Sequence, residues 1–131
     1  MKHDDLFLLR SIFNSDDDGN PIEEIWTGYD KSLNLIVLLE HTDYDYPEYN
    51  CATYAVINKE DAFSLARRLK VNMTDLPDII ADSIDSQYLE IINPSLRQTK
   101  ECFAEILECF ADERCRIRLV RTCGAYGYSC F

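Results

Sequence analysis

The stretch LNLIVLLE, residues 33–40, decides which fold class this chain adopts. Six of its eight residues are apolar, and five of those follow one another without a break. A short continuous apolar run is typical of a β-strand that is buried on both faces. The chain is 131 residues long, which is enough for one hydrophobic core. We therefore expect a single domain, residues 1–131, built around this strand.

Further strands are predicted on both sides of that stretch. Residues 22–29 precede it, and residues 51–57 follow it with alternating apolar character. The loop over residues 42–50 is too short for a helical crossover, so the strands that it joins should run antiparallel. Charged and apolar residues alternate over residues 114–122, which predicts a fourth, half-exposed strand.

Helices are predicted in the remaining parts of the chain. Their expected ranges are residues 4–13, residues 58–70, a short helix beginning at Thr74, and residues 95–112. Asn58 should cap the second helix, and the pair Asn93-Pro94 should begin the last one. Together these elements predict an α+β fold: an antiparallel sheet of about four strands with helices packed mainly on one side.

The charge of the chain is strongly negative and unevenly distributed. There are 24 acidic and 13 basic residues, a formal net charge of −11, and residues 1–50 hold twelve of the acidic residues but only three of the basic ones. Such a field repels nucleic acid and anionic membranes and attracts basic surfaces. We therefore expect a basic protein partner, no nucleic acid and no membrane. No secretory leader is evident, so a cytoplasmic location is expected.

The segment TDYDYPEYN, residues 42–50, is the first candidate binding site. It interleaves three carboxylates with three tyrosines, a side chain enriched at interface hot spots. The candidate residues are Asp43, Tyr44, Asp45, Tyr46, Glu48 and Tyr49. In the alternative interpretation, the tyrosines hold this loop against its own sheet while the acidic side chains remain solvated.

A second acidic segment, residues 14–20, is a candidate for the same partner surface through Asp16, Asp17 and Asp18. Its spacing matches half of a calcium-binding loop, but the position that needs a bidentate glutamate is Ile25. We expect a solvated turn, and no metal site.

No motif for catalysis, phosphate binding or a cofactor is present. The six cysteines have no zinc-binding spacing, and we expect small, buried, reduced thiols, with Cys102 and Cys109 on one helical face. No catalytic residue is predicted. One alternative is a small-ligand site that combines His41, Cys51 and the acidic loop.

Arginines at the other end of the sequence suggest a different surface. Arg114, Arg116 and Arg118 should share one face of the last predicted strand. Such charges protect an edge strand from aggregation. They also leave open a homodimer through this strand or through the aromatic C-terminal residues.

One segment resembles a known class of proteins. The residues are YAVINKEDA at 54–62, followed by LARRL at 65–69 and Leu76-Pro77. This strand, cap and helix pattern resembles small acidic bacterial immunity proteins, which neutralise polymorphic or contact-dependent toxins. The resemblance implies a cytoplasmic, single-domain, non-catalytic protein whose partner is a toxin domain, often a basic nuclease. It assigns no role to any individual residue.

Overall fold

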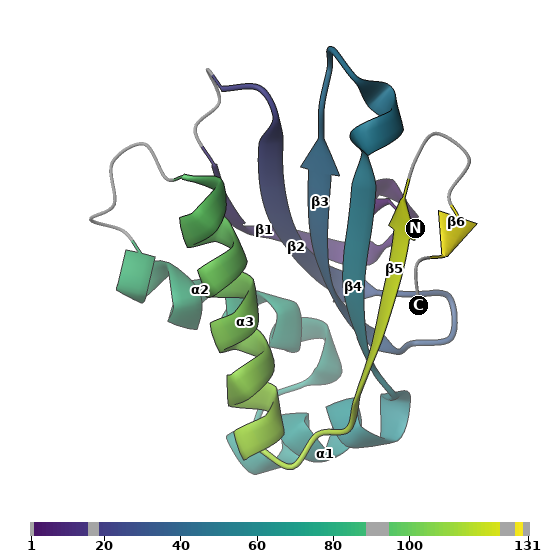
Figure 1. Cartoon of the computed structure of the whole chain (residues 1–131). Helices are drawn as coiled ribbons and strands as arrows, with labels where there is room; N and C mark the ends of the chain where they lie inside the picture. Colours follow the sequence, from purple (N-terminus) through teal and green to yellow (C-terminus); the bar gives the residue numbers. More distant parts are fainter. Residues whose placement is uncertain (1, 16–18, 89–94, 124–127, 130–131) are drawn as a thin grey trace.

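A computed structural model describes residues 2–15, 19–88, 95–123 and 128–129 of the chain. Its centre is a single antiparallel sheet in which every strand pairs with its neighbours in sequence, in the order β1-β2-β3-β4-β5-β6 (Figure 1). The strands are β1 Phe7–Asn14, β2 Ile22–Tyr29, β3 Leu35–Thr42, β4 Cys51–Ile57, β5 Ile117–Cys123 and the two-residue β6 Tyr128–Ser129. The predicted α+β class is confirmed.

The three α-helices lie between β4 and β5 in sequence and cover one face of the sheet (Figure 1). They are α1 Lys59–Leu69, α2 Leu76–Tyr88 and α3 Leu96–Asp112, accompanied by the 3-10 turns η1 His3–Asp5, η2 Pro47–Tyr49 and η3 Met73–Asp75. The cap of α1 is the predicted one, because the Asn58 side chain accepts a hydrogen bond from the Asp61 backbone N–H at 2.8 Å. The predicted placement of the helices on one side of the sheet is also confirmed (Figure 1).

The predicted central strand is β3, and it is buried on both faces. Leu35 and Val37 belong to the main core between the sheet and the helices, whereas Ile36 and Leu38 belong to a second cluster on the opposite face. All four are inaccessible to solvent. A continuous apolar run in this strand follows directly from the need to fill both layers.

The predicted helix over residues 4–13 is wrong, because most of that segment is strand β1. β1 pairs with β2 through two register shifts, and Leu8 adopts a positive φ of 54°. Residues 2–6 then lie against the opposite face of the sheet, where the His3 ring stacks on Trp26 with 4.4 Å between centroids. Pairing with β2 and burial on the sheet outweigh the local helical spacing. β1 and the short β6 also bring the strand count above the expected four.

Several further boundaries differ from the prediction: β3 covers Leu35–Thr42 instead of residues 33–40, and α2 begins at Leu76, after the 3-10 turn η3, instead of at Thr74. Ser95 is the N-cap of α3 and accepts from the Gln98 backbone N–H at 3.1 Å, so the helix begins at Leu96; residues 93–94 lie outside the described residues. β5 begins only at Ile117, because the chain is still leaving α3 through a turn, in which Arg114 has a positive φ of 63°.

The predicted arginine stripe is consequently absent from β5. Arg114 and Arg116 precede the strand, and the Arg116 backbone N–H donates to Asp61 Oδ2 at 2.9 Å. Arg118 and Arg121 lie within the strand but three positions apart, so their side chains point to opposite faces.

Candidate functional site

The loop between β3 and β4, residues 43–50, has a backbone held in place by Asp43; we name it the acidic tyrosine loop. The Asp43 carboxylate oxygen Oδ1 accepts from the backbone N–H groups of Asp45 and Tyr46, each at 3.0 Å. It also accepts from the Asn20 side-chain amide at 3.2 Å. Burial acts to raise the pKa of Asp43, but these hydrogen bonds bring it below its ordinary value. Asp43 therefore acts as an internal anchor of the loop.

The far end of the loop closes on the same residue. The Asp43 backbone N–H donates to the Asn50 side-chain oxygen at 2.7 Å. Between them Pro47 opens the 3-10 turn η2, in which the Tyr49 N–H donates to the Tyr46 carbonyl at 2.9 Å. The loop is thus bonded within itself along its length.

The three tyrosines of this loop point into solvent. Tyr44 is 69% exposed, Tyr46 57% and Tyr49 62%. The Tyr46 and Tyr49 rings lie together with 5.9 Å between centroids. The alternative in which the tyrosines hold the loop against the sheet is therefore wrong, and Asp45 and Glu48 are exposed beside them.

Asn20 connects this loop to the second acidic segment. Its side-chain amide also donates to Asp45 Oδ2 at 2.9 Å, and its side-chain oxygen accepts from the Tyr44 backbone N–H at 3.0 Å. The β1–β2 and β3–β4 loops therefore meet at one end of the sheet. Asp16, Asp17 and Asp18 lie outside the described residues.

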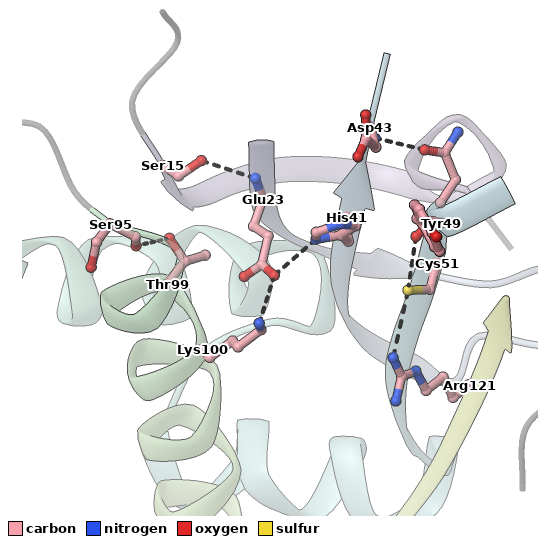
Figure 2. Close-up of polar contacts among 11 residues, drawn as sticks. Ser15, Glu23, His41, Asp43, Tyr49, Cys51, Ser95, Thr99, Lys100 and Arg121 are labelled. Carbon is pink, nitrogen blue, oxygen red and sulfur yellow. Dashed lines mark hydrogen bonds and ion pairs between the residues drawn. The ribbon is translucent and has the colours of Figure 1, made fainter. Parts of the chain in front are cut away.

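A hollow of about 560 Å³ lies beside the acidic tyrosine loop, between the sheet and α3. Its charged and polar lining residues include Glu23, His41, Tyr49, Cys51, Lys100 and Arg121 (Figure 2). Glu23, His41 and Cys51 stand directly opposite one another on β2, β3 and β4. The pairing of antiparallel strands thus brings together His41, Cys51 and the end of the acidic loop.

Glu23 is the buried charge of this hollow. Its side chain is 1% exposed, and Oε1 lies 3.2 Å from Lys100 Nζ and 3.0 Å from His41 Nδ1. Its other oxygen, Oε2, has no hydrogen-bond partner among the described residues. A buried carboxylate requires such partners to offset its lost hydration. The ion pair therefore holds the first turns of α3 against β2.

Glu23, His41 and Cys51 are the residue types of a nucleophilic triad, but Cys51 is not hydrogen-bonded to His41 as a triad would require. The Cys51 thiol donates to the Tyr49 carbonyl at 3.4 Å, and Arg121 Nη2 lies 3.6 Å from the sulfur. A nucleophile needs its base within hydrogen-bond reach, and no thiol–imidazole bond occurs in the described part of the chain. The hollow supports no catalytic assignment.

An apolar hollow of about 610 Å³ at the opposite end of the sheet was not predicted from the sequence. Leu8, Leu33 and Phe63 line it with about half of each side chain exposed. Phe63 could have been recognised from the sequence, because this apolar residue lies outside the apolar face of α1. Leu33 could not, since the apolar run assigns it to the central strand. Glu23, Lys100 and Arg121 were also missed, because nothing in the local sequence distinguishes them from surface charges.

Several of the acidic side chains in the first fifty residues accept hydrogen bonds within the protein itself. Glu40 accepts from the His3 ring at 2.6 Å, and Asp30 accepts two backbone N–H groups in its own turn. Glu23 and Asp43 are bonded internally as described above. Among the described residues of the acidic tyrosine loop, Asp45 and Glu48 are the exposed carboxylates that a partner could contact.

Neither a cluster of metal ligands nor a helix that could span a membrane occurs within residues 2–15, 19–88, 95–123 and 128–129. No three His, Cys, Asp or Glu side chains in that part of the chain converge as metal ligands. None of its helices is both long enough and apolar enough to cross a membrane.

Comparison with known proteins returned no relatives: no family model, no curated protein and no solved structure matches the chain.

Proposed function

We propose that this chain is a non-catalytic binding protein that occludes a basic protein partner through the acidic tyrosine loop. One observation carries the proposal: three tyrosines, each more than half exposed, project from a loop whose backbone is held by Asp43 and Asn20. The function that fits is that of a cytoplasmic immunity protein which blocks a toxin domain such as a nuclease.

The physical advantage of this loop is that its order is established before binding. Binding costs free energy for every side chain and loop that must be ordered, and a pre-organised loop reduces that cost. Tyrosine adds a large rigid contact area with one polar end. Asp45 and Glu48 would pair with Lys or Arg on the partner and accelerate encounter.

The resemblance of residues 54–62, 65–69 and 76–77 to acidic immunity proteins supports the same conclusion. Toxin nuclease domains are frequently basic because they bind phosphate backbones. A surface that carries carboxylates beside aromatic side chains suits such a domain, and steric coverage of its substrate groove requires no catalysis.

The test is direct binding to the protein encoded by the neighbouring upstream gene, measured by surface plasmon resonance at several salt concentrations; a neighbour without a toxin-like domain would count against the proposal. Tyr44→Ala, Tyr46→Ala and Tyr49→Ala should each weaken the complex by about tenfold, as for a hot-spot aromatic residue. Asp45→Asn should lower the association rate and its dependence on salt.

Two exposed residues of α1 provide matched controls. Phe63→Ala removes an aromatic side chain and Glu60→Gln a carboxylate at the other end of the sheet. Both should leave the affinity within twofold of the wild type. Loop variants that bind as tightly as these controls would contradict the proposal.

A homodimer is the second candidate, favoured by the apolar hollow around Leu8, Leu33 and Phe63. Exposed apolar patches often mark protein interfaces. The charged residues that line this hollow, Lys59 and Glu60, are of opposite sign, so the lining itself adds no net charge that would repel a second copy. Sedimentation equilibrium decides: Leu33→Asp should dissociate such a dimer, and a wild-type protein that remains monomeric at high concentration excludes it.

A further inference from the structure

Cys51 and Cys123 face each other across the last long strand pair of the sheet. They are register partners on β4 and β5, both are half-buried, and neither is in a disulfide. Residues directly opposite in an antiparallel pair have Cα atoms about 4.5–5.5 Å apart, within the range that disulfides span. Their side chains leave the sheet on the same face, so the two sulfurs can approach without a change of register.

A contact with a guanidinium distinguishes the surroundings of Cys51. Arg121 Nη2 lies 3.6 Å from the Cys51 sulfur, so a positive charge faces the sulfur that would act as the nucleophile. Cys109, by contrast, is exposed rather than buried as the sequence predicted, and its pKa is raised by partial burial and by four acidic neighbours on α3 and its end. Burial likewise raises the pKa of the Cys115 thiol.

We propose that Cys51 and Cys123 form a redox modification site, which a low-molecular-weight disulfide such as oxidised glutathione converts to a cross-strand disulfide. The Cys51 thiolate attacks one glutathione sulfur, forming a mixed disulfide and releasing one glutathione thiolate. The Cys123 thiolate then attacks the Cys51 sulfur and releases the second glutathione. Two protein thiols are oxidised, one glutathione disulfide is reduced to two glutathione thiols, and the two protons leave with them or with solvent.

The bond is expected to be easily reduced. Opposed Cβ atoms in a sheet lie about 4.5–5.5 Å apart, whereas a disulfide brings them to about 3.8 Å. Closing the bond therefore pulls β4 and β5 together, and strained disulfides are the labile ones. This site is suited to reversible modification rather than to permanent stabilisation.

The modification also reaches the acidic tyrosine loop. In the reduced protein the Cys51 thiol donates to the Tyr49 carbonyl, and the disulfide removes that donor and displaces the sulfur from Arg121. We expect oxidation to change partner affinity at least threefold. This second step rests on the proposed function, whereas the disulfide itself does not.

The experiment uses the purified full-length chain with oxidised glutathione at pH 7, quenched with N-ethylmaleimide and analysed by peptide mass spectrometry. Wild type should yield a Cys51–Cys123 peptide pair that dithiothreitol reverses. Cys123→Ser should stop at glutathione on Cys51, and Cys51→Ser should leave Cys123 unmodified. Arg121→Gln should slow the reaction of Cys51 by about threefold or more, whereas Arg118→Gln, on the opposite face of β5, should not.

Several results would overturn the inference: a stable mixed disulfide on Cys51 in wild type, modification of Cys109 before Cys51, or a bond from either cysteine to Cys130. If the disulfide forms and partner affinity is unchanged, the regulatory step is wrong while the modification site and the binding function both stand. If neither the reduced nor the oxidised form binds, the proposed function fails and the disulfide does not.

Discussion

Asn20 donates a side-chain hydrogen bond to Asp43 across the two loops at one end of the sheet, with 3.2 Å between Nδ2 and Oδ1. The same amide contacts Asp45, and its oxygen accepts from the backbone of Tyr44. Two segments that are far apart in the sequence therefore share one hydrogen-bond network. The network buries the carboxylate of Asp43. The tyrosine side chains of the loop take no part in it and point into solvent.

The first prediction concerns the order of this loop. Asp43→Ala removes the acceptor of the Asp45 and Tyr46 amides, so their hydrogen exchange measured by NMR should accelerate at least about tenfold. Asp45→Ala is the control, because the Asp45 carboxylate bonds only the Asn20 side chain among the described contacts. Unchanged exchange in Asp43→Ala would show that the loop is held by other contacts.

The second prediction is a dependence of stability on pH at the junction of α1 and β5. The Arg116 backbone N–H, followed by its side chain, holds the pKa of Asp61 below its ordinary value. The folded state therefore favours the ionised carboxylate, and the stability that this contributes is present at neutral pH and disappears as the pH falls through the lowered pKa.

Thermal melts of Asp61→Asn between pH 2 and pH 7 test this dependence. The variant should melt below the wild type at pH 6, and the difference should shrink toward pH 2. Glu60→Gln, an exposed change of the same kind in the same turn of α1, should track the wild type. A difference that stays constant with pH would assign the effect to helix capping instead of to the charge of Asp61.

The third prediction concerns the buried carboxylate of Glu23. Lys100→Met removes the ammonium group 3.2 Å away, and we expect the free energy of unfolding to fall by about 2 kcal/mol. Breaking a buried pair usually costs roughly 3–5 kcal/mol, and the loss is smaller here because the Lys100 side chain is 61% exposed. Urea denaturation provides the measurement.

Two variants separate this charge effect from loss of packing. Arg97→Met on the same helix breaks an exposed pair with Glu101 and should cost only about 0.3 kcal/mol. Adding Glu23→Gln to Lys100→Met should recover part of the stability, because the uncompensated charge is then gone. No recovery in the double variant would mean that Lys100 contributes by packing alone.

The fourth prediction concerns Tyr29, whose hydroxyl donates to the Met73 carbonyl at 2.6 Å. Tyr29→Phe leaves that carbonyl without its partner and should lower the free energy of unfolding by about 1 kcal/mol. Burial raises the pKa of Tyr29 to about 12. Alkaline spectrophotometric titration should therefore lose one late-titrating tyrosine in the variant, and Tyr44→Phe should retain it.

The sequence predicted much of the fold because several elements carry strong local signals. β2 and β4 have the predicted bounds, Ile22–Tyr29 and Cys51–Ile57, and Asn58 caps α1 as expected. The N-terminal segment shows where such signals fail. The apolar side chains within residues 4–13 fit a helical period, but Leu6, just before β1, and Ile12 within it are buried in different layers, one on each face of the sheet. Only the pairing with β2 decides that arrangement.

The candidate site divides in the same way. Composition and turn residues identified residues 43–50 as a polar, aromatic loop, since Pro47 and the interleaved carboxylates disfavour a regular strand. Whether its tyrosines point inward or outward depends on which polar group the loop buries, and that group is Asp43. Cys109 was misplaced for a related reason: the face of α3 that meets the sheet is chosen by packing, not by residue spacing alone.

The sequence alone determined the doubly buried central strand, the antiparallel α+β class, the Asn58 cap of α1 and the position of the acidic tyrosine loop, because each depends on residues close together along the chain. Only the tertiary structure decided the strand pairing that places Glu23, His41, Cys51 and Cys123 in one row, the Lys100 contact from α3, and the joining of Asn20 to Asp43. These contacts connect residues that are distant in sequence, so their geometry follows from sheet register and layer packing, which no local pattern encodes.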